Sequence, residues 1–553
     1  MATHDTMPAA DAALAGQDLP ARRARLLRRW AWRAAMIVGW AALVVALGAL
    51  GALGFQPLGW WWASLVSVAG LVWLVGACES RRWAGLVGWL WGVGHFACGN
   101  NWIATAFTYQ AKMPAWLGGV AVVALSLYLA AYPALAAAIG WGLRRSAVGR
   151  VAGFAGAWIL SEWLRSWVFT GFAWNPLGVA LLGDFHHAGL AGLAPALGTY
   201  GVSGLMAGLG AAMAAGAAGL RARRWASGAA LAAGPVALVG AAMQWPTATD
   251  AAPGHVPYTL VQPDIPQAML NDPAWFNWQF ARSAALTQDS RPAHRIVLWP
   301  ESGTPEYLRD RYPAWMYQFT FGGDPWLARL RLARVAGEGA LLLTGAVDLE
   351  VKDGKALAGR NVITVLDQRG QIVGSYAKAH LVPYGEYLPM RALLQPLGLA
   401  RLVPGDIDFL PGPGPRTLDL GPLGKAGMQI CYEIVFSGQV IDAAHRPDYI
   451  FNPSNDGWFG DWGPPQHLAQ ARLRAIEEGV PVLRSTTNGI SAVVDANGLV
   501  RQWAGRDVPA RLDGLVPPAH APTLFARMGN GLPVGLAIVL IGVSLLACRR
   551  RRG

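Results

Sequence analysis

Apolar residues are distributed very unevenly along the chain of 553 residues. Residues 34–245 form an almost unbroken series of apolar blocks, residues 246–525 mix short apolar runs with polar ones, and one more apolar block follows. Most blocks reach the roughly 20 residues that a helix needs to cross a bilayer core. We therefore expect a polytopic α-helical membrane domain with about eight spanning helices. The blocks lie at 35–55, 57–78, 84–105, 115–143, 150–168, 188–219, 226–245 and 530–548.

The region 246–525 has the pattern of an ordinary water-soluble domain. Runs rich in Val, Ile and Leu predict strands, and stretches at 273–288, 325–337 and 465–479 predict helices between some of them. Strands that alternate with helices indicate an α/β layered domain, and about 280 residues can bury a core without metals or disulfides. The predicted strands lie at 256–262, 295–299, 340–346, 361–367, 427–432, 448–452, 481–486 and 491–495.

Charge changes this picture only in the membrane part. The net charge is +12, but nucleic-acid binding is not expected, because the 246–525 domain is close to neutral and the arginines cluster between apolar blocks. If eight helices alternate across the bilayer, every cluster falls on the same side of the membrane. An excess of Lys and Arg is typical of loops on the cytoplasmic side. The clusters are Arg22 to Arg33, Arg81 and Arg82, Arg144, Arg145 and Arg150, Arg221 to Arg224, and Arg549 to Arg552.

This arginine pattern predicts the topology. Both termini would be cytoplasmic, and the 246–525 domain would lie outside the cytoplasm, between the seventh helix and the eighth at 530–548. Residues 1–33 are polar and alanine-rich, so we expect a cytoplasmic tail without regular structure. Residues 549–553 would form a short basic tail on the same side.

Cys431 is the single cysteine of the 246–525 domain, whereas Cys78, Cys98 and Cys548 lie in or beside apolar blocks. We expect those three to be inert small hydrophobic residues. A lone thiol in an oxidising compartment is either buried or used chemically. Spacing alone leaves both possibilities open for Cys431.

Ionisable residues follow two predicted strands of the domain. Glu301 comes just after the strand at 295–299, where a rigid, partly desolvated carboxylate would suit a general base; a solvated loop glutamate is the alternative. Lys378 follows another strand and could pair with Glu386. An ammonium group in a dry site can stabilise an oxyanion, but a surface ion pair fits the pattern equally well.

Cys431 ends its predicted strand and is followed by Tyr432 and Glu433. A nucleophile at a strand-to-turn junction presents its sulfur at the edge of the sheet, and a thiol needs a base or a nearby cation to become a thiolate. In the order Glu301, Lys378, Cys431, each at a strand end, these residues resemble the catalytic centre of the nitrilase superfamily. The resemblance implies a four-layer αββα sandwich that cleaves or makes amide-type bonds.

A longer series of motifs resembles the apolipoprotein N-acyltransferase family, the membrane-embedded branch of that superfamily. Where this family often has a tryptophan shortly after its VQ strand, this chain has Ala268 to Asn271, so no contact by such a tryptophan is predicted. The matching motifs are WPES at 299–302, KAHLVPYGEYLP at 378–389, CYE at 431–433, NPSNDGWFG at 452–460, QHLAQARLRAIE at 466–477, RSTTNGIS at 484–491, EWLR at 162–165 and GFAWNPLG at 171–178.

The resemblance assigns roles to residues of the domain. It implies that Cys431 is the nucleophile, Glu301 the general base and Lys378 the cation that stabilises the oxyanion. Glu386 would position Lys378. Tyr432 and Glu433 would support the nucleophile, and the segment with Trp458 and Phe459 would be a mobile arm that contacts substrate at the membrane face.

The implied reaction is a ping-pong acyl transfer through a cysteine thioester. The donor would be a phospholipid that gives up the acyl chain from its sn-1 position, with phosphatidylethanolamine expected. The acceptor would be the N-terminal amine of diacylglyceryl-cysteine on a lipoprotein. The expected setting is the bacterial inner membrane, with a periplasmic catalytic domain and a monomeric enzyme. No metal and no organic cofactor is expected.

Three alternatives stay open at this point. Glu162 and Arg165 are three residues apart near a helix end, so they share a face and could contact substrate or form a structural ion pair. A membrane-tethered amidase or nitrilase for small amides is disfavoured by the HLVPYGE and NDGWFG motifs. A transporter with a large external domain is disfavoured because no clear internal repeat is present.

Overall fold

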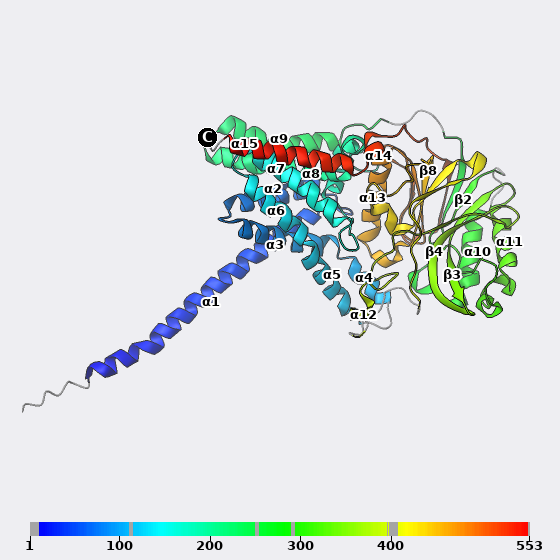
Figure 1. The fold of residues 1–553 in the computed structure, drawn as a ribbon, viewed down its shortest axis with the longest axis horizontal. Coiled ribbons are helices and arrows are strands. Elements are labelled where there is room, and N and C mark those ends of the chain that lie inside the picture. The colour runs from blue at the N-terminus through cyan, green and yellow to red at the C-terminus, as the bar shows by residue number, and fades with distance from the viewer. Residues whose placement is uncertain are drawn as a thin grey trace, which may run out of the picture.

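The chain forms a bundle of apolar helices joined to a domain with two β-sheets (Figure 1). The computed structural model describes residues 10–109, 114–248, 254–288, 294–394, 396 and 407–550. The helices of the bundle are α1 (Ala10–Ala52), α2 (Trp61–Ala77), α3 (Arg81–Gly99), α4 (Ile103–Ala106), α5 (Trp116–Leu129), α6 (Ala131–Leu143), α7 (Ala147–Arg165), α8 (Ala194–Arg221), α9 (Trp225–Met243) and α15 (Gly531–Arg549).

Each of the eight apolar blocks contains helix, and the block at 115–143 contains the consecutive helices α5 and α6. By length and composition, five helical segments among the described residues could cross a membrane, and α2 is apolar but shorter. The five segments are Arg23–Ala52, Trp116–Leu143, Leu190–Arg221, Trp225–Met243 and Gly531–Arg549.

Helix α1 begins earlier than the sequence pattern predicts. We expected residues 1–33 to lack regular structure, but the helix starts at Ala10 and extends from the bundle as a long rod (Figure 1). Alanine, leucine and arginine, which fill much of this stretch, are strong helix formers, so the local preference is helical. The ends of the two expected tails, 1–9 and 551–553, lie outside the described residues.

The second domain contains two six-stranded sheets, in the orders β12-β1-β2-β3-β4-β5 and β11-β10-β9-β8-β7-β6. In each sheet the central pairs, β2 with β1 and β3, and β8 with β7 and β9, are parallel, and the outer pairs are antiparallel. The strands are β1 (Pro257–Gln262), β2 (Ile296–Leu298), β3 (Leu341–Lys352), β4 (Lys355–Leu366), β5 (Ile372–Ala377), β6 (Arg416–Asp419), β7 (Lys425–Met428), β8 (Tyr449–Ser454), β9 (Val482–Thr486), β10 (Ser491–Val494), β11 (Val500–Ala504) and β12 (Ala510–Leu515).

The sheets stack face to face, and helices cover their outer faces. On β2, Ile296 and Leu298 pack into the core between the sheets, while Val297 between them packs under α10 (Phe276–Thr287) and α11 (Pro325–Ala336). This alternation is what a strand that is buried on both faces requires. With α13 (Gly463–Glu478) on the second sheet, the domain has the expected αββα order.

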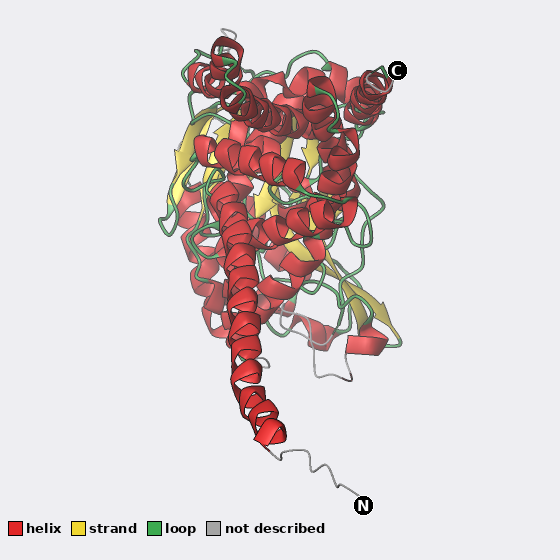
Figure 2. Cartoon of the chain, turned by 90° about the vertical axis from the view of Figure 1, so that its left-hand side faces the viewer, coloured by secondary structure: helices red, strands yellow, loops and turns green. Residues whose placement is uncertain are grey.

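Helix α13 lies between the second sheet and the apolar bundle (Figure 1; Figure 2 views the molecule from the bundle side). Leu468, Ala471 and Ala475 belong to the core of the domain, whereas Leu473 and Ile476 belong to the core of the bundle. Because the two sets lie on different faces of one helix, α13 fixes the two-sheet domain against the apolar bundle.

Candidate active site

Glu301 follows β2 and points toward the ends of neighbouring strands. Its Oε1 accepts hydrogen bonds from Asn361 Nδ2 at 2.7 Å and lies 3.4 Å from Lys378 Nζ, and its Oε2 accepts from the backbone N–H of Asn455 at 2.8 Å. The loop fits closely because Gly345 on β3 has no side chain; a Cβ there would lie 2.8 Å from the Cα of Glu301. The carboxylate is therefore buried and held from three directions.

Lys378 comes directly after β5 and is 2% exposed. Its Nζ lies 3.0 Å from the carboxylate of Glu386, and Asn361 Nδ2 also donates to Glu386 at 3.0 Å. Burial lowers the pKa of Lys378, but Glu386 and Glu301 outweigh burial and hold this pKa above its usual range. The amine therefore stays charged, which suits stabilisation of a negative oxygen.

Cys431 lies just beyond β7, in the short 3₁₀ turn Cys431–Val435, with its backbone in the left-handed region at φ 51°. Burial raises the pKa of its thiol well above the usual range, Glu301 raises it further, and Lys378 opposes both. The resting sulfur is therefore protonated, so a base has to take the proton as the sulfur attacks. Glu301 and Lys378 are the charged groups that act on this thiol most strongly.

Glu433 connects the cysteine turn to the lysine loop. Its carboxylate accepts hydrogen bonds from the backbone N–H groups of Ile430, Ala379 and His380 at 2.7, 2.7 and 3.0 Å, and from the Tyr376 hydroxyl at 2.8 Å. Burial raises the pKa of Glu433 to about 7, against the effect of these donors. These bonds join the turn that carries Cys431 to the loop that follows Lys378, so Glu433 holds the two segments together.

Tyr432 faces the bundle. Its ring stacks on Trp174 with centroids 6.4 Å apart, and it lies edge-on to Phe436. Trp174 belongs to the segment between α7 and α8, and its Nε1 donates to Gln466 on α13 at 2.8 Å. An aromatic contact thus joins the residue after the cysteine to the membrane part of the chain.

The segment expected to form an arm also touches the bundle. Phe459 lies 4.8 Å from Trp102 between ring centroids and 5.6 Å from Trp174, and Trp458 lies 5.8 Å from Tyr109. Both residues belong to the turn Asp456–Phe459, which follows β8. This turn therefore connects the catalytic residues with the helix α4 and its surroundings.

Glu162 and Arg165 lie in the last turns of α7 and are both buried. Glu162 Oε1 accepts from the Leu177 backbone N–H at 2.8 Å, while Arg165 donates to the carbonyls of Phe172 and Trp174 at 2.9 and 2.8 Å. Each side chain thus bonds to the backbone of the segment that carries Trp174. These bonds hold the segment in place, and the described contacts of the two residues include no ion pair between Glu162 and Arg165.

Several residues of the site were missed by sequence reasoning. Asn361 lies inside β4 and bridges Glu301 and Glu386, but a single asparagine in a strand gives no local signal of that role. Arg484 and His467 were noticed only as letters of motifs. Both are fully buried polar side chains, and their contacts are made across distant parts of the sequence.

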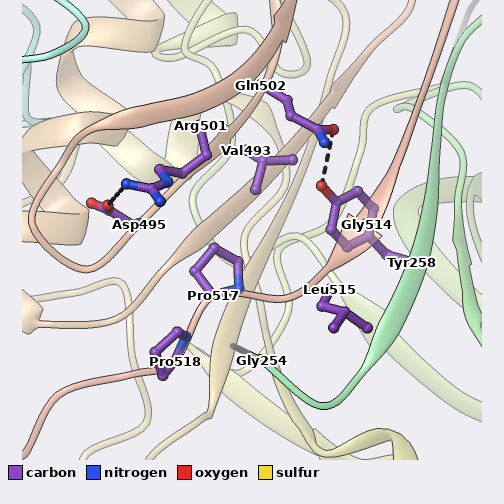
Figure 3. A pocket seen from close by; sticks show the side chains of 10 residues that line it. All are labelled: Gly254, Tyr258, Val493, Asp495, Arg501, Gln502, Gly514, Leu515, Pro517 and Pro518. Atoms are coloured by element: carbon purple, nitrogen blue, oxygen red, sulfur yellow. Dashed lines mark hydrogen bonds and ion pairs between the residues drawn. The ribbon is translucent and has the colours of Figure 1, made fainter. Parts of the chain in front are cut away.

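Outside this cluster, a cavity of about 320 Å³ opens at the edge where β11 and β12 meet (Figure 3). An ion pair of Arg501 with Asp495 and a hydrogen bond from Tyr258 to Gln502 lie on its walls. None of the residues that line it was predicted as a site residue.

Within the described ranges, no three His, Cys, Asp or Glu side chains come together as metal ligands would.

Both the helical part and the two-sheet domain of the chain match known protein families. Residues 47–212 match the family model of the apolipoprotein N-acyltransferase N-terminal domain, and residues 259–507 match that of carbon-nitrogen hydrolases. An apolipoprotein N-acyltransferase of Rhodopseudomonas palustris is 32% identical, covering 93% of this chain and 96% of the relative. One of Allorhizobium ampelinum is 34% identical, covering 86% and 89%. Solved structures include an amidase from Nesterenkonia sp. AN1 at 17% identity, covering 52% of this chain and 96% of the amidase, with a TM-score of 0.32.

The two matches define the class of protein: a nitrilase-type domain combined with apolar helices in a bacterial membrane protein. More narrowly, the chain belongs to the apolipoprotein N-acyltransferase family, and it is an acyltransferase. The predictions of family, enzyme class and nitrilase-like fold are confirmed.

Proposed function

We propose that this enzyme moves an acyl chain from a phospholipid, through a thioester on Cys431, to the N-terminal amine of diacylglyceryl-cysteine on a lipoprotein. The observation that carries the proposal is the buried group of Glu301, Lys378 and Cys431 in a domain that α13 fixes against apolar helices. The names of the relatives, which act on apolipoproteins, support the acceptor.

In the first half-reaction, Glu301 takes the thiol proton while the Cys431 sulfur attacks the sn-1 ester carbonyl of phosphatidylethanolamine. Lys378 and backbone N–H groups stabilise the oxyanion of the tetrahedral intermediate. The carbon–oxygen bond of the ester breaks, and the lysophospholipid alkoxide receives the proton from Glu301. The acyl chain stays on sulfur as a thioester.

In the second half-reaction, the α-amine of the diacylated cysteine attacks the thioester carbonyl. Glu301 collects the proton from the amine, the carbon–sulfur bond breaks, and the sulfur is protonated again. Glu386 and Asn361 keep Lys378 and Glu301 in place through both steps, and Glu433 and Tyr432 hold the cysteine turn.

The location follows from the substrates. Each CH₂ group of an acyl chain gains about 0.8 kcal/mol in an apolar environment, so neither lipid can leave the bilayer at a reasonable cost. A site close to the helix bundle lets both lipids react in turn. We propose that the turn with Trp458 and Phe459 opens to admit them and then shields the thioester from water.

The topology belongs to the same proposal. One-sided arginine clusters support eight spanning helices, cytoplasmic termini and a periplasmic catalytic domain in the inner membrane. All residues of the catalytic group come from one chain, so a monomer is sufficient.

Intact-protein mass spectrometry after incubation with phosphatidylethanolamine tests the donor step. We expect one added acyl chain, located on Cys431 by peptide mapping, and none in Cys431→Ala. Cys98→Ala is the matched control and should keep the adduct. Glu301→Gln and Lys378→Ala should form it far more slowly. Acylation by small amides but not by phospholipid would favour a membrane-tethered amidase and contradict the proposal.

The acceptor step has its own test. A synthetic diacylated lipopeptide with a free N-terminus should remove the acyl chain from the enzyme and gain its mass. The same lipopeptide with an acetylated N-terminus should leave the thioester intact. Equal discharge by both would show hydrolysis instead of transfer.

A further inference from the structure

The carbonyl of Cys431 is held from the side of α13 by a histidine. His467 Nε2 lies 3.0 Å from this carbonyl oxygen, and Asn452 Nδ2 lies 3.4 Å from it. Cys431 has φ 51°, a conformation that costs a non-glycine residue energy and persists only where the surroundings impose it. The hydrogen bond from His467 is one such constraint, and His467 has no exposed surface.

The contact with Cys431 and the low pKa of the ring together indicate which nitrogen of His467 carries the proton. A carbonyl can only accept, so Nε2 donates to Cys431. Burial and the charge of Arg484 together lower the pKa of His467 to about 4, although Asp456 opposes them, so the ring is neutral at pH 7. Nδ1 then carries no proton and accepts from the guanidinium of Arg484, which lies 3.0 Å from it. Asp456 Oδ1 lies 3.1 Å from the same nitrogen, and Arg484 also donates to this oxygen.

Arg484 is itself fixed, so the imidazole cannot rotate freely. Its guanidinium donates to both carboxylate oxygens of Asp456 at 2.7 Å, to Asn452 Oδ1 at 2.6 Å and to Ser454 Oγ at 2.9 Å. Arg484 and Asp456 are completely buried as an ion pair. A chain of bonds thus runs from this ion pair through His467 to the peptide group after the nucleophile.

A planar trans peptide carries its C=O and N–H on opposite sides. The bond from His467 to the Cys431 carbonyl therefore also sets the direction of the N–H of Tyr432, which points away from α13. We propose that His467 is a positioning residue that aims the Tyr432 backbone N–H at the oxyanion, as a donor beside Lys378. This inference rests on the proposed acyl transfer.

Two substitutions separate this role from packing. The amide nitrogen of glutamine reaches about as far as Nε2 of histidine, whereas that of asparagine corresponds to Nδ1. His467→Asn should therefore lose the bond to Cys431, and His467→Gln should keep it. Removal of one oxyanion donor typically slows acyl chemistry about 100-fold or more. We expect about that loss for His467→Asn and less than about tenfold for His467→Gln.

The second readout is alkylation of Cys431 by iodoacetamide, followed by peptide mass spectrometry so that the other cysteines are distinguished. Alkylation displaces iodide and forms no oxyanion, so His467→Asn should change its rate less than about threefold. Gln470→Asn is the matched control, since it shortens another buried side chain of α13 without contacting the cysteine. It should leave the ratio of acylation to alkylation unchanged.

The outcomes are distinct. If His467→Asn slows acylation and alkylation by the same factor, or slows neither, the positioning role is wrong while the acyl transfer stands. If His467→Asn does not fold, His467→Gln decides: a 100-fold loss of acylation with normal alkylation and normal thermal stability overturns the role. If the wild-type enzyme forms no thioester from phosphatidylethanolamine, the proposed function itself fails, and this inference with it.

Discussion

Glu301 with Lys378 and Glu162 with Arg165 are two of the buried pairs of charged residues in this molecule, and they differ in what they bind. Glu301 and Lys378 are held mainly by other side chains, Asn361 among them. Glu162 and Arg165 are held mainly by the backbone between α7 and α8, with one further bond from Trp158 Nε1 to Glu162 at 3.0 Å. The bonds of Glu162 and Arg165 fix the loop that carries Trp174, whereas Glu301 and Lys378 both act on the Cys431 thiol. The same residue types thus perform different tasks.

The sharpest test of this comparison replaces the acid of each pair by its amide. Glu301→Gln removes the base that has to accept the thiol proton, so the rate of thioester formation should fall on the order of 10³-fold. Glu162→Gln keeps an oxygen that can accept from Leu177, so its rate per folded molecule should stay within about threefold of wild type. Both rates come from mass spectrometry of the acyl-enzyme. Equal losses in both variants would break the distinction.

Asn361 gives a second test, because it contacts both carboxylates of the catalytic group. Asn361→Ala should slow thioester formation by about 10- to 100-fold, since Glu301 loses the 2.7 Å bond that fixes it and shifts away from its working position. Thr364→Ala, on the same strand and more deeply buried than Asn361, is the control and should have little effect on the rate. If both alanine variants are equally slow, the effect lies in β4 and not in the amide bridge.

The sequence was enough to single out the candidate residues that follow strands. It was not enough to identify the residues that contact and hold them. Glu301, Lys378 and Cys431 could be singled out as candidates because each follows a predicted strand and lies in a motif that resembles the family's. Asn361 could not, since its partners lie 60 and 25 residues away in sequence and no pattern of period two encodes such a contact. Strand β5 was inferred only as the segment before Lys378, and β6, β11 and β12 were not predicted.

The junction with the bundle was the other part that the sequence could not provide. Gln466 and Trp174 are 292 residues apart and meet because α13 is buried on both sides. Periodicity predicted the helix at 465–479 close to its observed bounds. It could not indicate that the second buried face of α13 packs on membrane helices, because an apolar position looks the same whichever partner covers it.

Stability provides a third test, with a smaller effect. Arg165→Met removes two hydrogen bonds from a charged donor to backbone carbonyls, each typically worth about 1.5 kcal/mol or more, so we expect a loss of about 3 kcal/mol. The midpoint of thermal unfolding should fall clearly. The rate of acylation at a temperature where the variant is folded should fall far less than in Glu301→Gln. A large loss of rate without a loss of stability would instead indicate a substrate contact of Arg165.

The smallest expected effect concerns the pH dependence of stability. It compares His467 in the folded protein, where the ring binds a backbone carbonyl, with the same residue in the unfolded chain. His467 has its pKa lowered to about 4 from its ordinary value of 6.5, because burial and Arg484 outweigh the opposite effect of Asp456. As pH falls below 6.5 the unfolded chain gains a proton that the folded protein does not accept until about pH 4. The stability present above pH 6.5 is therefore lost as pH falls. Glutamine does not titrate, so His467→Gln should gain about 2 kcal/mol relative to wild type between pH 7.5 and pH 5. Thermal unfolding of the two proteins across this range measures the difference, and parallel curves would contradict a neutral His467.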